Sequence, residues 1–121
     1  MNERVEALRR RTFAFGVAVL ALCRKYPETP EGRVARYQLA KCGTSVGANY
    51  RAVCRARSRA EFLSRMSIVL EEADEAEYWL HVTLEASLLE RPLVEPLAQE
   101  AGELVAIFTA SLVTARRNAG E

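Results

Sequence analysis

The sequence has few of the residues that build metal sites and nucleophilic sites. Its 121 residues include one histidine, His81, and three cysteines, Cys23, Cys42 and Cys54, none of them in a CxxC spacing. A di-iron bundle uses Glu-x-x-His pairs on two helices, whereas Glu77 and His81 are four residues apart and no second histidine exists. No Ser/His/Asp or Cys/His arrangement is recognisable. We therefore predict no metal, no cofactor and no enzymatic activity.

Long apolar runs are also missing. The longest candidate, FAFGVAVLALC from Phe13 to Cys23, is shorter than the roughly 20 residues that span a bilayer. It follows three arginines and so resembles a secretion signal, but Glu3 and Glu6 precede it and no convincing small-residue cleavage site follows. The odd number of cysteines indicates reduced thiols. We expect a cytoplasmic protein without a membrane partner.

Glycine and proline total only ten, and no segment alternates with period two, which disfavours disorder and β-sheet. Apolar residues instead recur at spacings of three and four in four blocks. Pro27, the Thr29-Pro30 start, the capping box from Ser58 to Glu61 and the Arg91-Pro92 break separate these blocks. The expected helices are about 3–26, 30–55, 59–89 and 93–117. The sequence predicts an all-α, antiparallel up-and-down four-helix bundle in one domain, 1–121.

The second expected helix has small residues along part of its length. Gly43 and Gly47 lie beside Ser45 and Ala48, and small side chains let neighbouring helices approach closely. The same segment, GTSVG, lacks the Gly-Lys-Ser/Thr continuation and the preceding strand of a phosphate-binding loop. Asn49 falls on the apolar seam of this helix. It is either a buried residue that fixes the register through hydrogen bonds or a sign that the seam is shifted by one residue.

The net charge of +1 hides a strong asymmetry. Residues 1–70 hold 14 Lys/Arg against 5 Asp/Glu, whereas residues 71–121 hold 3 against 11. Guanidinium groups bind phosphate well, so the basic segment includes candidate nucleic-acid-binding residues. These are Arg51, Arg55, Arg57 and Arg59, with a second group at Arg9, Arg10 and Arg11. The alternative is that they form ion pairs with the acidic run Glu71, Glu72, Asp74, Glu75 and Glu77, on the same subunit or a neighbour.

Two of the expected helices carry a second apolar stripe, away from the core seam. A lone four-helix bundle has no use for two apolar faces on one helix, whereas an oligomer buries the second face. The alternative is a wide intramolecular core. The predicted oligomer interface comprises Phe13, Val17 and Leu20 on the first helix and Ile68, Tyr78, Trp79 and Val82 on the third.

One long segment, TSVGANYRAVCRARSRAEFLSRMSIVLEEADEAEYWL, together with FTASLVTARRN near the end, resembles a bacterial four-helix-bundle family. This family comprises the ribosomal RNA intervening-sequence proteins, and its fold group includes the accessory variability protein of diversity-generating retroelements. The resemblance covers nearly the whole chain. Where relatives often continue the asparagine with Ile-Ala-Glu-Gly, this chain has Tyr50-Arg51-Ala52-Val53, which makes the local surface more basic.

The resemblance implies a ring-like homopentamer and, for the retroelement members, binding to RNA or DNA and to a reverse transcriptase. We therefore expect a non-catalytic, oligomeric binding module of bacterial type. Its leading function is that of a nucleic-acid-binding accessory protein acting with a reverse transcriptase. The alternative is a purely structural homo-oligomer that binds a protein partner.

Overall fold

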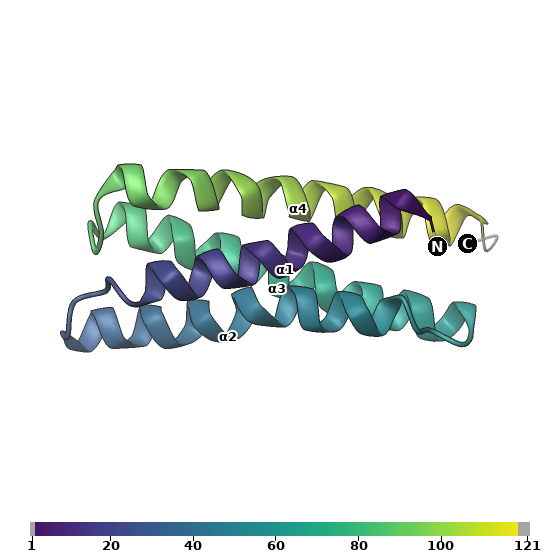
Figure 1. Cartoon of the computed structure of the whole chain (residues 1–121), viewed down its shortest axis with the longest axis horizontal. Coiled ribbons are helices and arrows are strands. Elements are labelled where there is room, and N and C mark those ends of the chain that lie inside the picture. Colours follow the sequence, from purple (N-terminus) through teal and green to yellow (C-terminus); the bar gives the residue numbers. More distant parts are fainter. Residues whose placement is uncertain (1, 119–121) are drawn as a thin grey trace.

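The computed structural model describes residues 2–118, which form four helices and no strand. The helices are α1 (Glu3–Cys23), α2 (Pro30–Val53), α3 (Arg59–Glu85) and α4 (Arg91–Asn118). Consecutive helices run in opposite directions, and the start of α1 and the end of α4 lie at the same end of the bundle as the α2–α3 turn (Figure 1). The predicted all-α, up-and-down bundle is confirmed.

Side-chain caps start the first three helices. The Asn2 side chain accepts a hydrogen bond from the Arg4 amide at 2.7 Å and caps α1. Thr29 caps α2 by accepting from the Gly32 amide at 3.1 Å, with Pro30 as the first helical residue. Ser58 caps α3 by accepting from the Glu61 amide at 3.0 Å. Each cap satisfies an amide that has no partner within its helix, which confirms the starts predicted for α2 and α3.

The helix ends differ more from the sequence expectation. Helix α1 ends at Cys23 rather than Tyr26, although Tyr26 is still buried. Helix α3 ends at Glu85 rather than about residue 89, because Ser87 adopts a left-handed backbone with φ of 54°. The Leu88 amide then donates to the Thr83 carbonyl at 3.0 Å, which closes the helix. Helix α4 starts at Arg91, since Pro92 in the first turn needs no amide partner.

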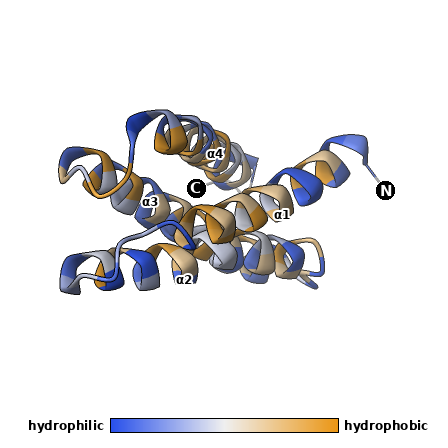
Figure 2. Ribbon diagram, turned by 60° about the vertical axis from the view of Figure 1, so that its left-hand side comes forward, coloured by the Kyte–Doolittle hydropathy of each residue, from blue (hydrophilic) through white to orange (hydrophobic). Residues whose placement is uncertain are grey.

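The core is continuous along the bundle. Helices α1 and α2, α2 and α3, and α3 and α4 pack against each other extensively, whereas α1 and α4 touch little. Helix α1 crosses the others obliquely, and apolar residues line the inner faces of the helices (Figure 2). The largest fully buried side chains include Phe108, Leu39, Leu80 and Leu104. Tyr26 and Thr83 are buried together and share a hydrogen bond between their hydroxyls.

The seam of α2 departs from the expected one at a single position. Tyr50 is buried, with 4% of its surface exposed, and its ring lies 5.7 Å from that of Phe108. Asn49 is only half-buried, and its side-chain amide donates to the Ser45 carbonyl of the same helix at 2.8 Å. The seam is therefore shifted by one residue here. Asn49 is not a core residue that fixes the register.

Helices α1 and α2 cross closely at their small residues. A Cβ atom built on Gly47 would lie 3.2 Å from the Thr12 carbonyl carbon and oxygen. One built on Gly43 would lie 2.8 Å from a Val19 methyl. The close helix approach predicted from Gly43 and Gly47 is therefore present.

Candidate nucleic-acid interface

The fold gathers positive charge at one end of the bundle. The end with the α2–α3 turn takes in the first half of α1, the end of α2, the start of α3 and the last part of α4 (Figure 1). Residues 2–12, 45–70 and 105–118 hold 11 arginines and 3 glutamates, a net charge of +8. The other described residues, 13–44 and 71–104, hold 6 Lys/Arg and 12 Asp/Glu, a net charge of −6. One half of the molecule is thus strongly basic.

A hollow of about 570 Å³ lies between the end of α2 and the start of α3. Its floor is Ala48 and Ala52, and we call it the arginine hollow for its cationic lining of Arg51, Arg55, Arg57 and Arg65. Arg51 lies in the last turn of α2 and Arg55 in the turn just after its end, and both are exposed. Arg57 enters from the turn and Arg65 from α3. Small floor residues leave room for a ligand, and the guanidinium groups favour an anionic one.

Glu61 is the one acidic residue of this lining, and it organises two of the arginines. Its carboxylate accepts from the Arg57 amide at 2.9 Å and from Arg65 Nε at 3.2 Å. These two interactions, the first being the larger, lower the pKa of the Glu61 carboxyl. The cap that the sequence predicted at Ser58 is therefore formed. The reciprocal bond to the Glu61 carboxylate comes from the amide of Arg57, the residue before the cap, where a capping box uses the amide of the cap residue itself.

The other predicted arginines divide into separate groups. Arg59 lines a different cleft, where its Nη1 lies 3.4 Å from the Ala115 carbonyl. Arg9 and Arg10 lie 3.6 Å and 3.9 Å from the Glu6 carboxylate. Arg11 turns away toward α4, and its guanidinium binds Glu100 at 2.7 Å and Glu103 at 2.6 Å. Those two ion pairs raise the pKa of Arg11. The Arg11 guanidinium is therefore engaged in a link between α1 and α4.

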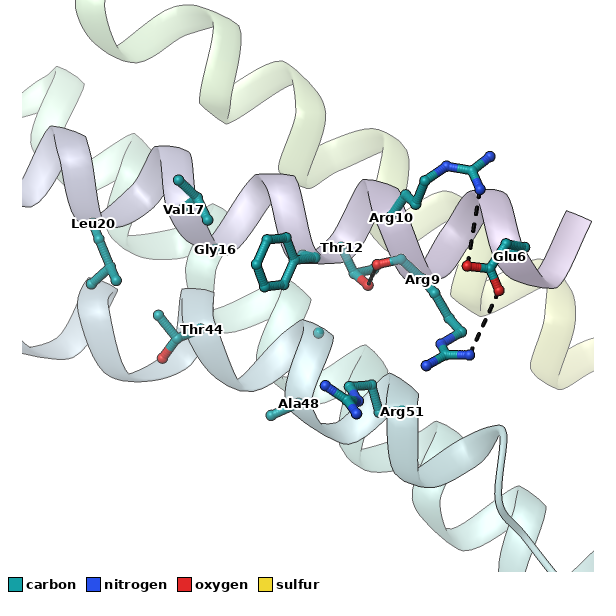
Figure 3. Close-up of a pocket in the computed structure, with 12 residues that line it drawn as sticks. Glu6, Arg9, Arg10, Thr12, Gly16, Val17, Leu20, Thr44, Ala48 and Arg51 are labelled. Atoms are coloured by element: carbon teal, nitrogen blue, oxygen red, sulfur yellow. Dashed lines mark hydrogen bonds and ion pairs between the residues drawn. The ribbon is translucent and has the colours of Figure 1, made fainter.

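A groove of about 700 Å³ runs between α1 and α2 and meets the arginine hollow at Ala48 and Arg51. Apolar side chains form much of it, and Arg9, Arg10 and Glu6 stand at one end (Figure 3). In this view Arg9 points from α1 toward α2, on the side where Arg51 lies. The basic residues of α1 and α2, which the sequence left unconnected, therefore border one surface.

The predicted interface residues differ in exposure. On α1, Phe13 is 68% exposed, Val17 55% and Leu20 42%, and all three line the groove. On α3, Ile68 and Tyr78 are exposed. Trp79 and Val82 are half-buried, and Trp79 packs against the core. The stripe on α1 therefore remains uncovered in one subunit, whereas part of the stripe on α3 belongs to the intramolecular core.

The proposed pairing of the arginines with the acidic run does not occur within one subunit. Among the described residues, the side chains of Arg51, Arg55, Arg57 and Arg59 form no ion pair with any residue from Glu71 to Glu77. Glu77 instead lies 3.6 Å from His81 of the same helix. Among the residues that line the arginine hollow, Glu61 is thus the only one whose negative charge offsets the four arginines.

Sequence reasoning missed Arg65 and Arg4. Arg65 lies four residues after Glu61, so the helical spacing alone would have placed it beside the capping box. Arg4 lines the same cleft as Arg59, but it comes from α1. Only the packing of α1 near the end of α4 brings the two together.

The described residues, 2–118, contain no group of three or more His, Cys, Asp or Glu side chains placed to hold a metal ion. None of the four described helices combines the length and the apolar character that crossing a membrane requires.

The fold and the arginine hollow define the class: an all-α four-helix bundle with one basic end. The model of the 23S rRNA-intervening sequence protein family matches residues 7–110, so the chain belongs to this family. It is also similar to the crystal structure of a protein of unknown function from the S23 ribosomal protein family of Bacteroides thetaiotaomicron VPI-5482. The two are 28% identical with a TM-score of 0.78, over 86% of this chain and 96% of that chain. No curated protein matches the chain.

Proposed function

We propose that this protein is a non-catalytic, oligomeric nucleic-acid-binding module that contacts the phosphate backbone through the basic end of its bundle. The observation that carries the proposal is the arginine hollow, where Arg51, Arg55, Arg57 and Arg65 converge with one carboxylate among them. Guanidinium groups are permanently charged and bind phosphate oxygens in a bidentate manner.

The kind of binding follows from the kind of contact. Phosphate contacts carry no sequence information, and the apolar floor of Ala48 and Ala52 offers no hydrogen-bonding group that would select a base. Binding is therefore weak, largely independent of sequence and steeply dependent on salt, because each neutralised phosphate releases condensed counterions.

Assembly is the second part of the proposal. The exposed stripe of Phe13, Val17 and Leu20 supplies an apolar surface for a neighbouring subunit. The resemblance to ring-forming relatives favours a homopentamer, and for a retroelement member it adds a reverse transcriptase as partner. The same stripe supports the competing function, a structural homo-oligomer whose partner is another protein.

The test is a fluorescence-polarisation titration of labelled single-stranded RNA at several salt concentrations. The variant combines Arg51→Gln, Arg55→Gln and Arg57→Gln. Its matched control combines Arg24→Gln, Lys25→Gln and Arg33→Gln, which removes the same charge from exposed residues at the opposite end. We expect the first variant to lose affinity about tenfold or more at low salt, with a shallower salt dependence. The control should bind nearly as wild type does.

Equal losses in the two variants would mean that net charge alone drives binding. No binding by wild type at low salt would reject the nucleic-acid function and favour the structural oligomer. Size-exclusion chromatography with light scattering, run on all three proteins, verifies that they assemble alike. Copurification with a co-expressed reverse transcriptase from the same genome tests that partner.

A further inference from the structure

A second basic cleft lies on the other side of the α3 start, away from the arginine hollow. Its volume is about 560 Å³, and α1, α3 and α4 all contribute to it. Arg4 and Arg59 supply the charge, Phe62 supplies an aromatic ring, and Ser111 and Thr114 supply hydroxyl groups. Within the first two turns of α3, Arg59 and Phe62 face this cleft while Glu61 and Arg65 face the arginine hollow.

The Arg59 side chain is held only weakly. Its one described hydrogen bond, from Nη1 to the Ala115 carbonyl, measures 3.4 Å, near the upper limit for such a bond. Arg59 is exposed, and its guanidinium keeps further donor groups. Arg4 is exposed as well. Both side chains can therefore reorient toward an anion at little cost.

The carbonyl end of α4 borders this cleft and by itself repels anions. Arg116 and Arg117 lie in the last turn of α4, so the local balance of charge stays positive. The combination of guanidinium groups, hydroxyl groups and a half-buried ring matches a nucleotide, whose phosphate needs donors and whose base stacks on an aromatic side chain.

We propose that the cleft of Arg4, Arg59 and Phe62 is a second subsite for single-stranded nucleic acid, and that one strand crosses the α2–α3 turn to occupy both the arginine hollow and this cleft. The inference rests on the proposed function. A single strand suits the arrangement because its bases are free to turn toward Phe62, whereas the bases of a duplex stay stacked.

The experiment compares oligouridylates of 4 and 20 nucleotides by polarisation, with wild type and single variants. Arg4→Gln and Arg59→Gln each remove one positive charge from the cleft, and Arg55→Gln removes one from the arginine hollow. Arg33→Gln, at the opposite end of the bundle, is the control. We expect Arg4→Gln and Arg59→Gln to weaken binding of the 20-mer about three- to tenfold and to lower its salt slope by about 0.7 per lost phosphate contact. The 4-mer should lose no more than about twofold, because the arginine hollow still binds it.

Thermal melts of each variant separate binding from folding. If Arg59 only caps α4, Arg59→Gln lowers the melting temperature and leaves 20-mer affinity unchanged, which overturns the inference. Arg4→Gln keeps the test decisive, since Arg4 lies at the start of α1 and makes no hydrogen bond to the described end of α4. If Arg55→Gln is the only one of these variants that weakens binding of the 20-mer, the second subsite is rejected and the proposed function is kept. Failure of wild type to bind either oligonucleotide rejects both.

Discussion

At the scale of single residues, Gly43 and Gly16 face each other where α1 and α2 cross. A Cβ atom on Gly43 would approach the two methyl carbons of the buried Val19 to 2.8 and 2.9 Å, closer than real contacts allow. A Cβ atom on Gly16 would meet its nearest neighbours at 3.6 Å, an ordinary contact. The structure therefore has room for an alanine side chain at Gly16 but not at Gly43.

We predict that Gly43→Ala lowers the free energy of unfolding by about 1–3 kcal/mol, because the rigid Val19 must move within a full core. Gly16→Ala is the matched control, and it should be neutral or should stabilise by up to about 1 kcal/mol through helix propensity. Urea denaturation followed by circular dichroism measures both. Equal stability of the two variants would mean that the helices do not cross this closely.

The buried thiol of Cys42 makes stability depend on alkaline pH. Burial, together with the charges of Glu75 and Glu72, raises the pKa of this thiol to about 12. The folded protein therefore keeps a proton that the unfolded chain releases near its ordinary pKa of 9.0. The stabilisation is complete below pH 9 and is lost as the pH rises toward 12.

We expect the urea midpoint of the wild type to fall between pH 8 and pH 10.5. In Cys42→Ala it should fall less over the same interval, although the variant starts lower because of the cavity. Cys23 and Tyr26, whose pKa values burial raises to about 11 and about 12, still contribute in both proteins. An unchanged pH dependence in Cys42→Ala would show that this thiol is not desolvated.

At the scale of helices, α1 is the least enclosed element, because it packs on α2 but touches α4 little. Arg11 provides the main polar link to α4, with Nε 2.7 Å from one Glu100 oxygen and Nη2 2.8 Å from the other. Such bidentate contacts are stronger than single surface ion pairs, although this one is partly exposed.

Arg11→Gln should therefore destabilise the protein by about 0.5–1.5 kcal/mol and speed hydrogen exchange of the α1 amides. Arg10→Gln serves as control, since the Arg10 side chain is 71% exposed and its ion pair with Glu6 measures 3.9 Å. The free energy of unfolding of this variant should differ from that of wild type by less than about 0.5 kcal/mol. Nucleic-acid affinity should be unaffected in Arg11→Gln. A loss of affinity without a loss of stability would return Arg11 to the binding surface.

The helix starts were predictable from sequence because caps are local chemistry, as at Thr29 and Ser58. The end of α3 was not, since Ser87 adopts a left-handed backbone that is usual only for glycine. The position of Asn49 was ambiguous because the buried residue after Val46 can lie three or four positions further on, at Asn49 or at Tyr50. The contact of the Tyr50 ring with Phe108 shows that Tyr50 is the buried one. Arg11 and Arg4 needed the packing of whole helices before their partners or neighbours were apparent.

At the scale of the whole molecule, the basic end and the acidic remainder lie along one axis. Subunits in a closed ring are related by rotation about a single axis. Whichever way a subunit is tilted, its basic end therefore recurs at the same height in every copy. A ring of such subunits places its arginine hollows at one height around the axis, where one long strand can contact several of them.

Assembly and binding to long strands should therefore be lost together. Wild type should elute with a mass about five times the 13.5 kDa of one chain. Phe13→Ser combined with Val17→Ser removes exposed apolar surface but no arginine, and it should dissociate the ring while helicity is kept. Its control is Val34→Ser combined with Tyr37→Ser, since these α2 residues are similarly exposed, at 55% and 64%, but lie outside the groove.

The dissociated variant should bind a 4-nucleotide strand as wild type does, because each arginine hollow is intact. Its affinity for strands long enough to reach several subunits should fall by about 100-fold, since each further contact in the ring is intramolecular. Light scattering and polarisation on the same samples measure mass and affinity together. Full affinity for long strands in a monomeric variant would show that one subunit is the binding unit, and a wild type that is already monomeric would remove the ring from the proposal.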